Sequence, residues 1–208
     1  MLDLNKIYLF RMTHIENMPH ILNLGITHIS SLNRNKAYKS IGDSSLINRR
    51  NSVVIPNGKT LGDYIPFYFG NRMPMLYVVE KGYNSVAVTP AEKIIYCISS
   101  VQRIIDLNLD FIFTDGHAVN DLSSFYAPED AARIDTIIDT AAIQARWWNV
   151  EDLDLKRRKE AEFLVSNDIP TEAILGYAVF NETAKNQLHG LGVPLEKIVI
   201  KPNYYFST

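Results

Sequence analysis

The sequence predicts a mixed α+β domain built around a strongly bent or split β-sheet. Expected strands outnumber expected helices, and hairpin-like spacings between the strands are common. The chain has no internal repeat, linker or low-complexity tract, and its 208 residues are a usual length for one domain. We therefore expect a single domain over residues 1–208, large enough to fold without a disulfide or a structural metal.

The chain should open with a strand, a tight turn and a helix. Residues 7–10 form an apolar run typical of a buried strand. Thr13 and Glu16 have the spacing of a capping box, in which a hydroxyl and a carboxylate cap the first helical turn. Gly25 stands where that helix should end, and residues 26–29 should form the next strand.

A long polar segment, residues 30–62, comes next. We expect it to be a lid, because long loops in compact domains are usually functional or mobile. A short helix is expected within it, over 44–50. Residues 64–69 and 75–79 should be strands, and Pro66 restricts the first to an edge or a bulge because proline has no N–H to donate.

Apolar periodicity predicts the remaining elements. In chain order they are a strand over 94–98, a helix over 101–107, a strand over 111–113, a helix from 129 to about 148, strands over 161–165 and 172–180, a helix capped by Asn181 and closed near Gly190, and a strand over 196–201. The long helix should bury Ile134, Ile137 and Ile138 on one face.

Composition excludes several classes of protein. Cys97 is the only cysteine, which excludes an internal disulfide or a cysteine-rich metal site and fits a reducing, cytoplasmic compartment. The five histidines lack zinc-binding spacings, so we expect no metal. Residues 1–6 do not resemble a signal peptide, and no apolar run reaches the ~20 residues that cross a bilayer. Motifs of Walker-type ATPases, Rossmann dehydrogenases, elbow-type serine hydrolases and zincins are missing.

Basic residues gather in two short runs. The formal net charge of −2 argues against a general, high-affinity coat for nucleic acid, because lysine and arginine carry the phosphate contacts. Arg49 and Arg50 form one run, and residues 156–159 form the other. The second run is either a solvated face or one side of a local groove that holds phosphates.

Two carboxylates follow the second basic run. Glu160 and Glu162 lie two residues apart, so on a strand they face the same way, and Glu162 leads into the apolar residues 163–165. A carboxylate at the mouth of a buried strand is poorly solvated and well fixed, which suits stabilisation of a developing positive charge. The alternative is a pair of surface glutamates that balance their four basic neighbours.

Three other segments carry candidate functional residues. Residues 8–14 deliver a cation, Arg11, and a hydroxyl, Thr13, into a turn. Residues 63–77 are rich in aromatic side chains, and residues 113–118 contain a histidine after an Asp-Gly turn. Each also has an ordinary structural explanation, as a surface cation, a core cluster or a turn.

Together, these four segments resemble the DarT family in order and approximate spacing. Residues 113–118 read Phe-Thr-Asp-Gly-His-Ala, which is the family's motif unaltered. Residues 158–165 match its Arg-Arg-Gln-Ala-Glu-Phe-Leu-Val motif with changes, and residues 8–14 and 63–77 match its strand-turn and aromatic segments. The resemblance runs over residues 4–205, essentially the whole chain.

The resemblance implies an ADP-ribosyltransferase-like fold, in which two small packed β-sheets form an NAD cleft with flanking helices. It implies transfer of ADP-ribose from NAD to a base of single-stranded DNA, thymine favoured over guanine, with release of nicotinamide. It also implies a toxin whose partner is a DarG-like macrodomain antitoxin. We expect a monomer that does not bind membranes. The alternatives are a transferase acting on protein or RNA, and a non-enzymatic nucleotide-binding module.

The resemblance also assigns residues to roles. Glu162 matches the catalytic glutamate, and Arg49 or Arg50, undecided between them, matches the catalytic arginine. The cofactor-binding candidates are Arg11, Met12, Thr13 and Tyr68, under an NAD lid over residues 30–51. The candidates for DNA binding are His117, Tyr126, Trp147, Trp148, Arg157 and Arg158, in a recognition region over residues 117–162, where aromatic side chains stack on bases and basic ones hold phosphates.

Two positions depart from the family motifs. Arg11 stands where some members have histidine, and an arginine can bind phosphate or ribose oxygens through its forked guanidinium. Glu160 stands where many members have glutamine. A second carboxylate there places more negative charge near the DNA and bears on the choice of base.

Overall fold

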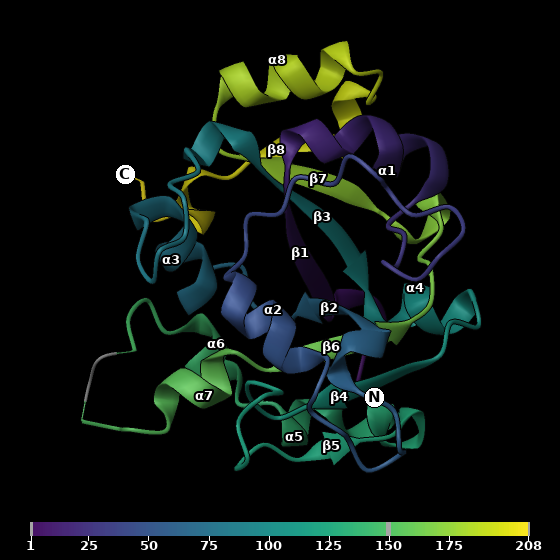
Figure 1. Cartoon of the computed structure of the whole chain (residues 1–208), viewed down its shortest axis with the longest axis vertical. Coiled ribbons are helices and arrows are strands. Elements are labelled where there is room, and N and C mark those ends of the chain that lie inside the picture. Colours follow the sequence, from purple (N-terminus) through teal and green to yellow (C-terminus); the bar gives the residue numbers. More distant parts are fainter. Residues whose placement is uncertain (1, 149–150, 208) are drawn as a thin grey trace.

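One eight-stranded sheet forms the centre of the protein, in a computed structural model that describes residues 2–148 and 151–207 (Figure 1). The strands are β1 Tyr8–His14, β2 Tyr64–Tyr68, β3 Ile94–Ser100, β4 Phe111–Thr114, β5 Phe125–Tyr126, β6 Glu162–Ser166, β7 Gly176–Val179 and β8 Ile198–Ile200. Their order across the sheet is β5-β4-β6-β2-β1-β3-β7-β8. All neighbours are antiparallel except β7 and β8. The mixed α+β class is confirmed.

The sheet is nearly divided between β1 and β2. These strands share a single register pair, Phe10 with Tyr68, whereas β1 pairs with β3 along its whole length. The next residue of β2 whose backbone faces β1 is Pro66, and proline has no N–H to donate to β1. The guanidinium of Arg11 enters the gap instead, and its Nη1 donates to the Pro66 carbonyl at 2.8 Å. The expected two sheets are therefore two halves of one sheet, which separate beside this joint (Figure 1).

Both halves are held by aromatic packing. Phe163 stacks on Phe111 with ring centroids 4.5 Å apart, and Phe69 meets Phe163 edge to face. In the other half, Tyr205 is fully buried and its hydroxyl donates to the Ile94 carbonyl at 2.9 Å. Such contacts bury a large apolar area while satisfying the one polar atom of the tyrosine.

The helices lie around the sheet. They are α1 Met18–Leu24, α2 Ser44–Arg50, α3 Pro74–Lys81, α4 Val101–Asp106, α5 Ile134–Ile137, α6 Thr140–Gln144, α7 Leu155–Lys159 and α8 Glu182–Gly190. Figure 1 shows α2 in front of the joint between the halves, with α1 above it and α6 and α7 below. The expected helices over 44–50 and 101–107 and the helix capped by Asn181 are confirmed.

The first turn differs from the expected capping box. Thr13 belongs to β1, and the helix is preceded by a 3-10 turn over Ile15–Asn17, which the His14 side chain caps by accepting from the Glu16 N–H. Gly25 does end α1, with φ of 79°. Only glycine fits there, because a Cβ would lie 2.1 Å from the Ile169 carbonyl oxygen.

Three expected elements were wrong in type or extent. Residues 75–79 form the middle of α3, which Pro74 begins and Gly82 ends, so their apolar spacing belongs to a helix rather than a strand. Residues 26–29 contribute only an isolated bridge at Ile26. The long helix after 129 is broken into a 3-10 turn, α5 and α6, because the Asp139 side chain caps α6 by accepting from the Ala142 N–H.

The last strands are shorter than expected. The strand expected over 172–180 is β7 alone, preceded by a 3-10 turn, and the strand expected over 196–201 is β8. Residues 161–165 correspond to β6, which begins at Glu162. No helix in the described part of the chain is long and apolar enough to cross a membrane.

Candidate active site

Glu162 is the first residue of β6 and is completely buried. Its Oε1 accepts from the Ala118 backbone N–H at 2.9 Å, and its Oε2 accepts from Arg50 Nη1 at 2.8 Å. The Glu162 N–H donates to the Thr114 hydroxyl at 3.1 Å, which ties the residue to β4. A buried carboxylate is costly unless it is paired and hydrogen-bonded, and these partners hold it in one orientation.

Helix α2 delivers the arginine. The Asp43 carboxylate caps this helix by accepting from the Ser45 and Leu46 N–H groups, and α2 ends at Arg50. The Arg50 side chain is 13% exposed, whereas Arg49 points outward. Burial opposes the charge of Arg50, but the Glu162 carboxylate outweighs it and the pKa of Arg50 lies above the ordinary arginine value. Of the two arginines, Arg50 is therefore the one that contacts Glu162.

One nitrogen of Arg50 has no protein partner. Its Nη2 is buried and makes no hydrogen bond within residues 2–148 and 151–207. A buried donor without an acceptor is unfavourable by about 1–3 kcal/mol. The arrangement thus fits a bound molecule that brings an oxygen to Arg50, beside the Glu162 carboxylate.

Tyr68 lies beside the pair. It is the register partner of Glu162 across β2 and β6, and its side chain is half-buried. Burial, reinforced by the Glu162 carboxylate, raises the pKa of Tyr68, so its hydroxyl stays protonated and is a hydrogen-bond donor at neutral pH.

His117 stands on the other side of Glu162, with its Nε2 3.9 Å from Glu162 Oε1. Its backbone is held by two bonds, because its N–H donates to the Arg157 carbonyl at 2.9 Å and its carbonyl accepts from the Ser123 hydroxyl at 2.8 Å. Burial lowers the pKa of His117 despite the nearby carboxylate, so the ring is neutral at pH 7.

A hollow of about 820 Å³ opens next to His117. Its lining includes Arg49 of α2, Lys156 of α7, Asn120 and Glu160. Glu160 is not on a strand, as the sequence interpretation assumed: it is the C-cap of α7, and only Glu162 begins β6. Its side chain is 7% exposed, and burial, with Glu162 adding to it, raises the pKa of Glu160 to about 7.

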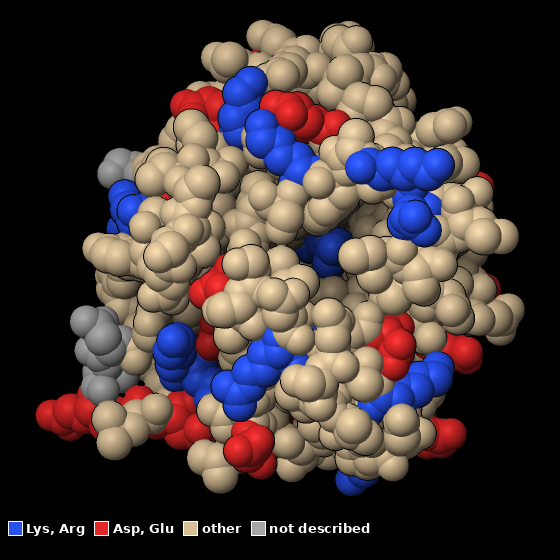
Figure 2. Space-filling model, viewed as in Figure 1, with Lys and Arg blue, Asp and Glu red and all other residues tan. Residues whose placement is uncertain are grey.

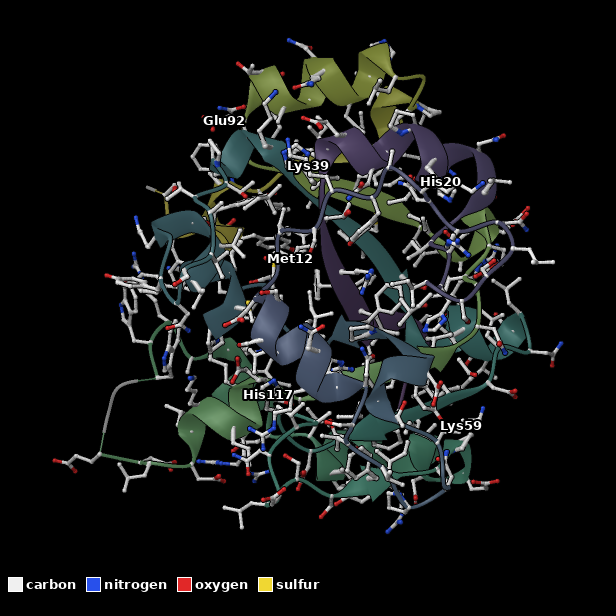
Figure 3. The ribbon with its side chains drawn as sticks, viewed as in Figure 1. Met12, His20, Lys39, Lys59, Glu92 and His117 are labelled. Atoms are coloured by element: carbon white, nitrogen blue, oxygen red, sulfur yellow. The ribbon has the colours of Figure 1, made fainter. Side chains whose placement is uncertain are left out.

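The three candidates on β1 have different surroundings. Met12 packs against the aromatic core around Tyr96, and Arg11 occupies the gap between the sheet halves. Thr13 is buried, and its hydroxyl accepts from Asn17 Nδ2 at 3.0 Å. In Figure 3, Met12 and His117 lie on opposite sides of α2.

Asn17 connects this turn to the lid, a role that the sequence interpretation missed. Its side chain is completely buried, donates to the Lys39 carbonyl at 2.9 Å and accepts from the Lys39 N–H at 2.8 Å. A second contact joins Lys39 Nζ to Glu16 at 2.8 Å. A buried asparagine four residues after Thr13 is the only sequence signal for this clamp.

The basic run is largely bound to internal partners. Arg157 donates to Asp154 and Asp115, and Arg158 pairs with Asp139 and Asp152. Lys159 is buried, and its Nζ donates to the carbonyls of Ile143 and Ala145. Lys156 is exposed at the hollow, so it is the residue of the run best placed to meet a phosphate.

The aromatic candidates lie in two places. Tyr126 stacks on Phe113 with centroids 5.3 Å apart, at the outer strand of the sheet. Trp147 and Trp148 belong to a separate cluster with Tyr77, Phe206 and the Arg72 guanidinium. Trp147 is 45% exposed and remains accessible for stacking.

The surface around α2 is hollowed. Figure 2 shows a depression near the middle of this face with a basic side chain at its floor, and further basic groups at the lower left. Among residues 2–148 and 151–207, no group of three or more His, Cys, Asp or Glu side chains is placed to hold a metal ion. The site and its hollow thus combine basic side chains with several carboxyl groups, of which Glu162 is completely buried.

A buried glutamate paired with an arginine from α2, beside the joint of a split sheet, fits an enzyme of the ADP-ribosyltransferase class. The family model for "ssDNA thymidine ADP-ribosyltransferase, DarT" matches residues 10–206. The chain belongs to the DarT family. The resemblance stated from the motifs is confirmed.

Relatives and solved structures agree with this assignment. A DNA ADP-ribosyl transferase of Thermus sp. (strain 2.9) is 34% identical, over 84% of this chain and 81% of that protein. The structure of Thermus sp. 2.9 DarT with ADP-ribosylated ssDNA has a TM-score of 0.82 at 29% identity, covering 96% of both chains. The same protein in complex with NAD⁺ has a TM-score of 0.77 at 28% identity, covering 96% of this chain and 98% of that one.

A longer relative carries a second activity. A DNA ADP-ribosyl transferase-DNA ADP-ribosyl glycohydrolase fusion protein of Thermosipho africanus is 27% identical, and the match covers 95% of this chain but 49% of that protein. The similarity to this chain therefore spans about half of the fusion.

Proposed function

We propose that Glu162 and Arg50 form the catalytic pair with which this chain transfers ADP-ribose from NAD to thymidine in single-stranded DNA. The chain is an NAD-dependent DNA ADP-ribosyltransferase of the DarT family. The observation that supports these residue roles most directly is the geometry of Glu162, which is completely buried with one oxygen on Arg50 and the other on the Ala118 N–H.

The residues around the pair fit a dinucleotide. Arg50 Nη2 is buried without a protein acceptor and is suited to a ribose hydroxyl or a phosphate oxygen. Arg11 places a second guanidinium in the gap between the sheet halves, and Tyr68 offers a hydroxyl donor beside Glu162. Residues 30–51, which carry α2 and are clamped by Asn17, act as the lid over the dinucleotide.

The reaction requires charge stabilisation at the ribose. Breaking the bond between nicotinamide and ribose leaves the sugar with oxocarbenium character. The Glu162 carboxylate stabilises this positive charge and orients the ribose, because its hydrogen bonds prevent it from turning away. Arg50 pairs with Glu162 through Nη1 and brings its Nη2, which has no partner among the described residues, to the same substrate.

The DNA side is the hollow next to His117. Arg49 and Lys156 are its basic groups, and they are suited to the base oxygens and to a phosphate. The exposed Trp147 offers a stacking surface for an unpaired base outside the hollow. Arg157 and Arg158 act indirectly, by holding the recognition loop through their aspartate partners.

The function is tested on short oligonucleotides. The protein is incubated with NAD and single-stranded DNA pools, with RNA and protein as alternative acceptors, and the products are identified by mass spectrometry. An added ADP-ribose on thymidine-containing DNA is the expected result, and modification confined to RNA or protein would contradict it.

Glu162→Ala tests the residue assignment in the same assay. Removing one stabilising group of this kind typically lowers a rate by about 10²–10³-fold. We expect at least that loss, with an unchanged circular dichroism spectrum. Glu196→Ala, at an exposed position before β8, is the matched control. Wild-type transfer by the Glu162 variant would refute the assignment.

We further propose that the chain is the toxin of a toxin–antitoxin pair. The support is the Thermosipho africanus relative, in which a DNA ADP-ribosyl transferase is fused to a DNA ADP-ribosyl glycohydrolase. The expected partner is a macrodomain glycohydrolase that removes ADP-ribose from DNA. Growth arrest on expression of the chain, relieved by such a glycohydrolase, is the predicted observation, and normal growth would contradict it.

A further inference from the structure

Glu160 is a buried carboxyl group that has no role in the chemistry proposed above for NAD. Its side chain is 7% exposed, and it accepts no hydrogen bond from the residues that the structure describes. It lines the same hollow as His117, and it lies two residues before Glu162. Its oxygens are not among the fully buried polar atoms that lack a partner in the described residues, so they are reached from the hollow. A largely buried carboxyl that lines a hollow is typical of functional rather than structural groups.

The acceptor base needs such a group. Thymidine has one ring N–H, flanked by two carbonyl oxygens, and its pKa lies well above neutrality. Transfer of ADP-ribose to this nitrogen forms a bond from it to C1′ of the ribose. The bond from C1′ to nicotinamide breaks, nicotinamide leaves with that electron pair, and the ring proton must go to a base.

We propose that Glu160 binds the ring N–H of the acceptor thymine and takes its proton during transfer. The inference rests on the proposed function, because it places the acceptor base in the hollow beside Glu162. The same hollow is lined by donors suited to the two base oxygens, from Arg49 on α2, Asn120 on the recognition loop and Lys156 on α7. An acceptor flanked by donors complements the thymine edge, whereas cytosine and adenine present a ring lone pair to the carboxylate.

The charged surroundings of Glu160 come from four elements. Lys156 and Lys159 on α7 favour its ionised form, and Glu162 on β6 opposes it. The hollow is also lined by Arg49 of α2 and by Asp43, the N-cap of that helix. His117 and Asp121 line it from the recognition loop. Burial dominates, so the pKa of Glu160 is raised to about 7. A base with a pKa near the working pH is the efficient one for proton transfer.

The first test is the pH dependence of transfer. Single-turnover rates are measured between pH 5.5 and 9 with saturating NAD and a thymidine oligonucleotide. The wild-type rate should rise with pH and level off above about 7, where Glu160 is ionised. Glu160→Gln should be slower by about 10²-fold at pH 8 and should lose this dependence. Glu196→Gln, at an exposed position, is the matched control.

The second test uses the acidity of the acceptor, which a purely structural role would not sense. Deoxyuridine and 5-fluorodeoxyuridine replace thymidine in the oligonucleotide, and the fluorinated base loses its ring proton more readily. The ratio of wild-type to Glu160→Gln rates should be smaller for the fluorinated base. Equal ratios for the two acceptors, or a variant that keeps the wild-type rate and pH profile, would overturn the inference.

The two proposals fail separately. Glu162→Ala tests the stabilisation of the ribose of NAD, and Glu160→Gln tests removal of the ring proton from the acceptor thymine. Loss of transfer in the Glu162 variant, together with wild-type behaviour of the Glu160 variant, overturns only the role of Glu160. Transfer that survives Glu162→Ala overturns the catalytic role of Glu162. Failure of the wild-type protein to add ADP-ribose to thymidine-containing DNA overturns the proposed function itself.

Discussion

Adjacent residues at the end of α2 have different surroundings. Arg50 turns inward and donates to Glu162 Oε2 at 2.8 Å, whereas Arg49 lines the hollow next to His117. A helix places consecutive side chains about 100° apart, so the two guanidinium groups leave α2 in different directions. One helix terminus therefore supplies a cation to Glu162 and another to the hollow that we propose as the acceptor side.

Arg50→Lys tests the inward role. Lysine keeps the charge but has a single, compact ammonium in place of two terminal nitrogens. It can pair with Glu162 but cannot also fill the position of Nη2. We expect transfer to fall by about 10²-fold, with a higher KM for NAD. Arg49→Lys is the matched comparison and should leave the KM for NAD within twofold; equal effects of both changes on that KM would contradict the distinction.

At the scale of elements, the lid is attached by its backbone. The Asn17 side chain donates to the Lys39 carbonyl and to the Thr13 hydroxyl and accepts from the Lys39 N–H, and Lys39 adds an ion pair with Glu16. The residues before α2 are thereby tied to the turn after β1. Because α2 carries Arg50, the position of the proposed lid should decide whether the proposed pair of Arg50 and Glu162 forms.

Asn17→Ala should loosen this attachment. The change leaves the N–H and the carbonyl of Lys39 without their partners, at a cost of about 1–3 kcal/mol. We expect the KM for NAD to rise by about tenfold, with a smaller fall in kcat, in steady-state kinetics. Asn33→Ala, an exposed asparagine of the same segment, is the control. An unchanged KM in the Asn17 variant would show that the clamp does not position the lid.

At the scale of the whole molecule, the active site lies where the sheet is weakest. The two halves meet through the single pair Phe10–Tyr68, and the next position on β2 toward the gap is closed by Arg11 on the Pro66 carbonyl. Glu162 is paired with Tyr68, so it begins its strand beside this joint. A site at the gap gains access for a ligand without removing any hydrogen bonds from the inner ladders.

Burial of Glu160 should make stability depend on pH. The pKa of this carboxyl is raised from 4.5 to about 7 by burial, so between these values the folded state binds more protons than the unfolded state. Stability should therefore fall as the pH rises from 4.5 to 7, by on the order of 3 kcal/mol from this group. Glu160→Gln removes the slope and should be more stable than the wild type at pH 8. Denaturant unfolding at pH 5 and pH 8 measures this, and a variant that is less stable at pH 8 would contradict it.

The sequence by itself determined the strands around Glu162 and pointed to this carboxylate as the candidate. The strands expected over residues 64–69, 111–113 and 161–165 correspond to β2, β4 and β6, and Glu162 stands at the start of the last. Such strands can be recognised in the sequence because the spacing of apolar residues along the chain indicates which side chains are buried. The motif over 113–118 likewise identified the family from contiguous residues.

Only the tertiary structure decided which groups meet. It selected Arg50 over Arg49 across 112 residues of sequence, placed Glu160 at a helix end, and bound Arg157 and Arg158 to aspartates. It also joined the two expected sheets through one pair of residues. Local periodicity carries no information about contacts between distant segments, because those depend on how whole elements pack against one another.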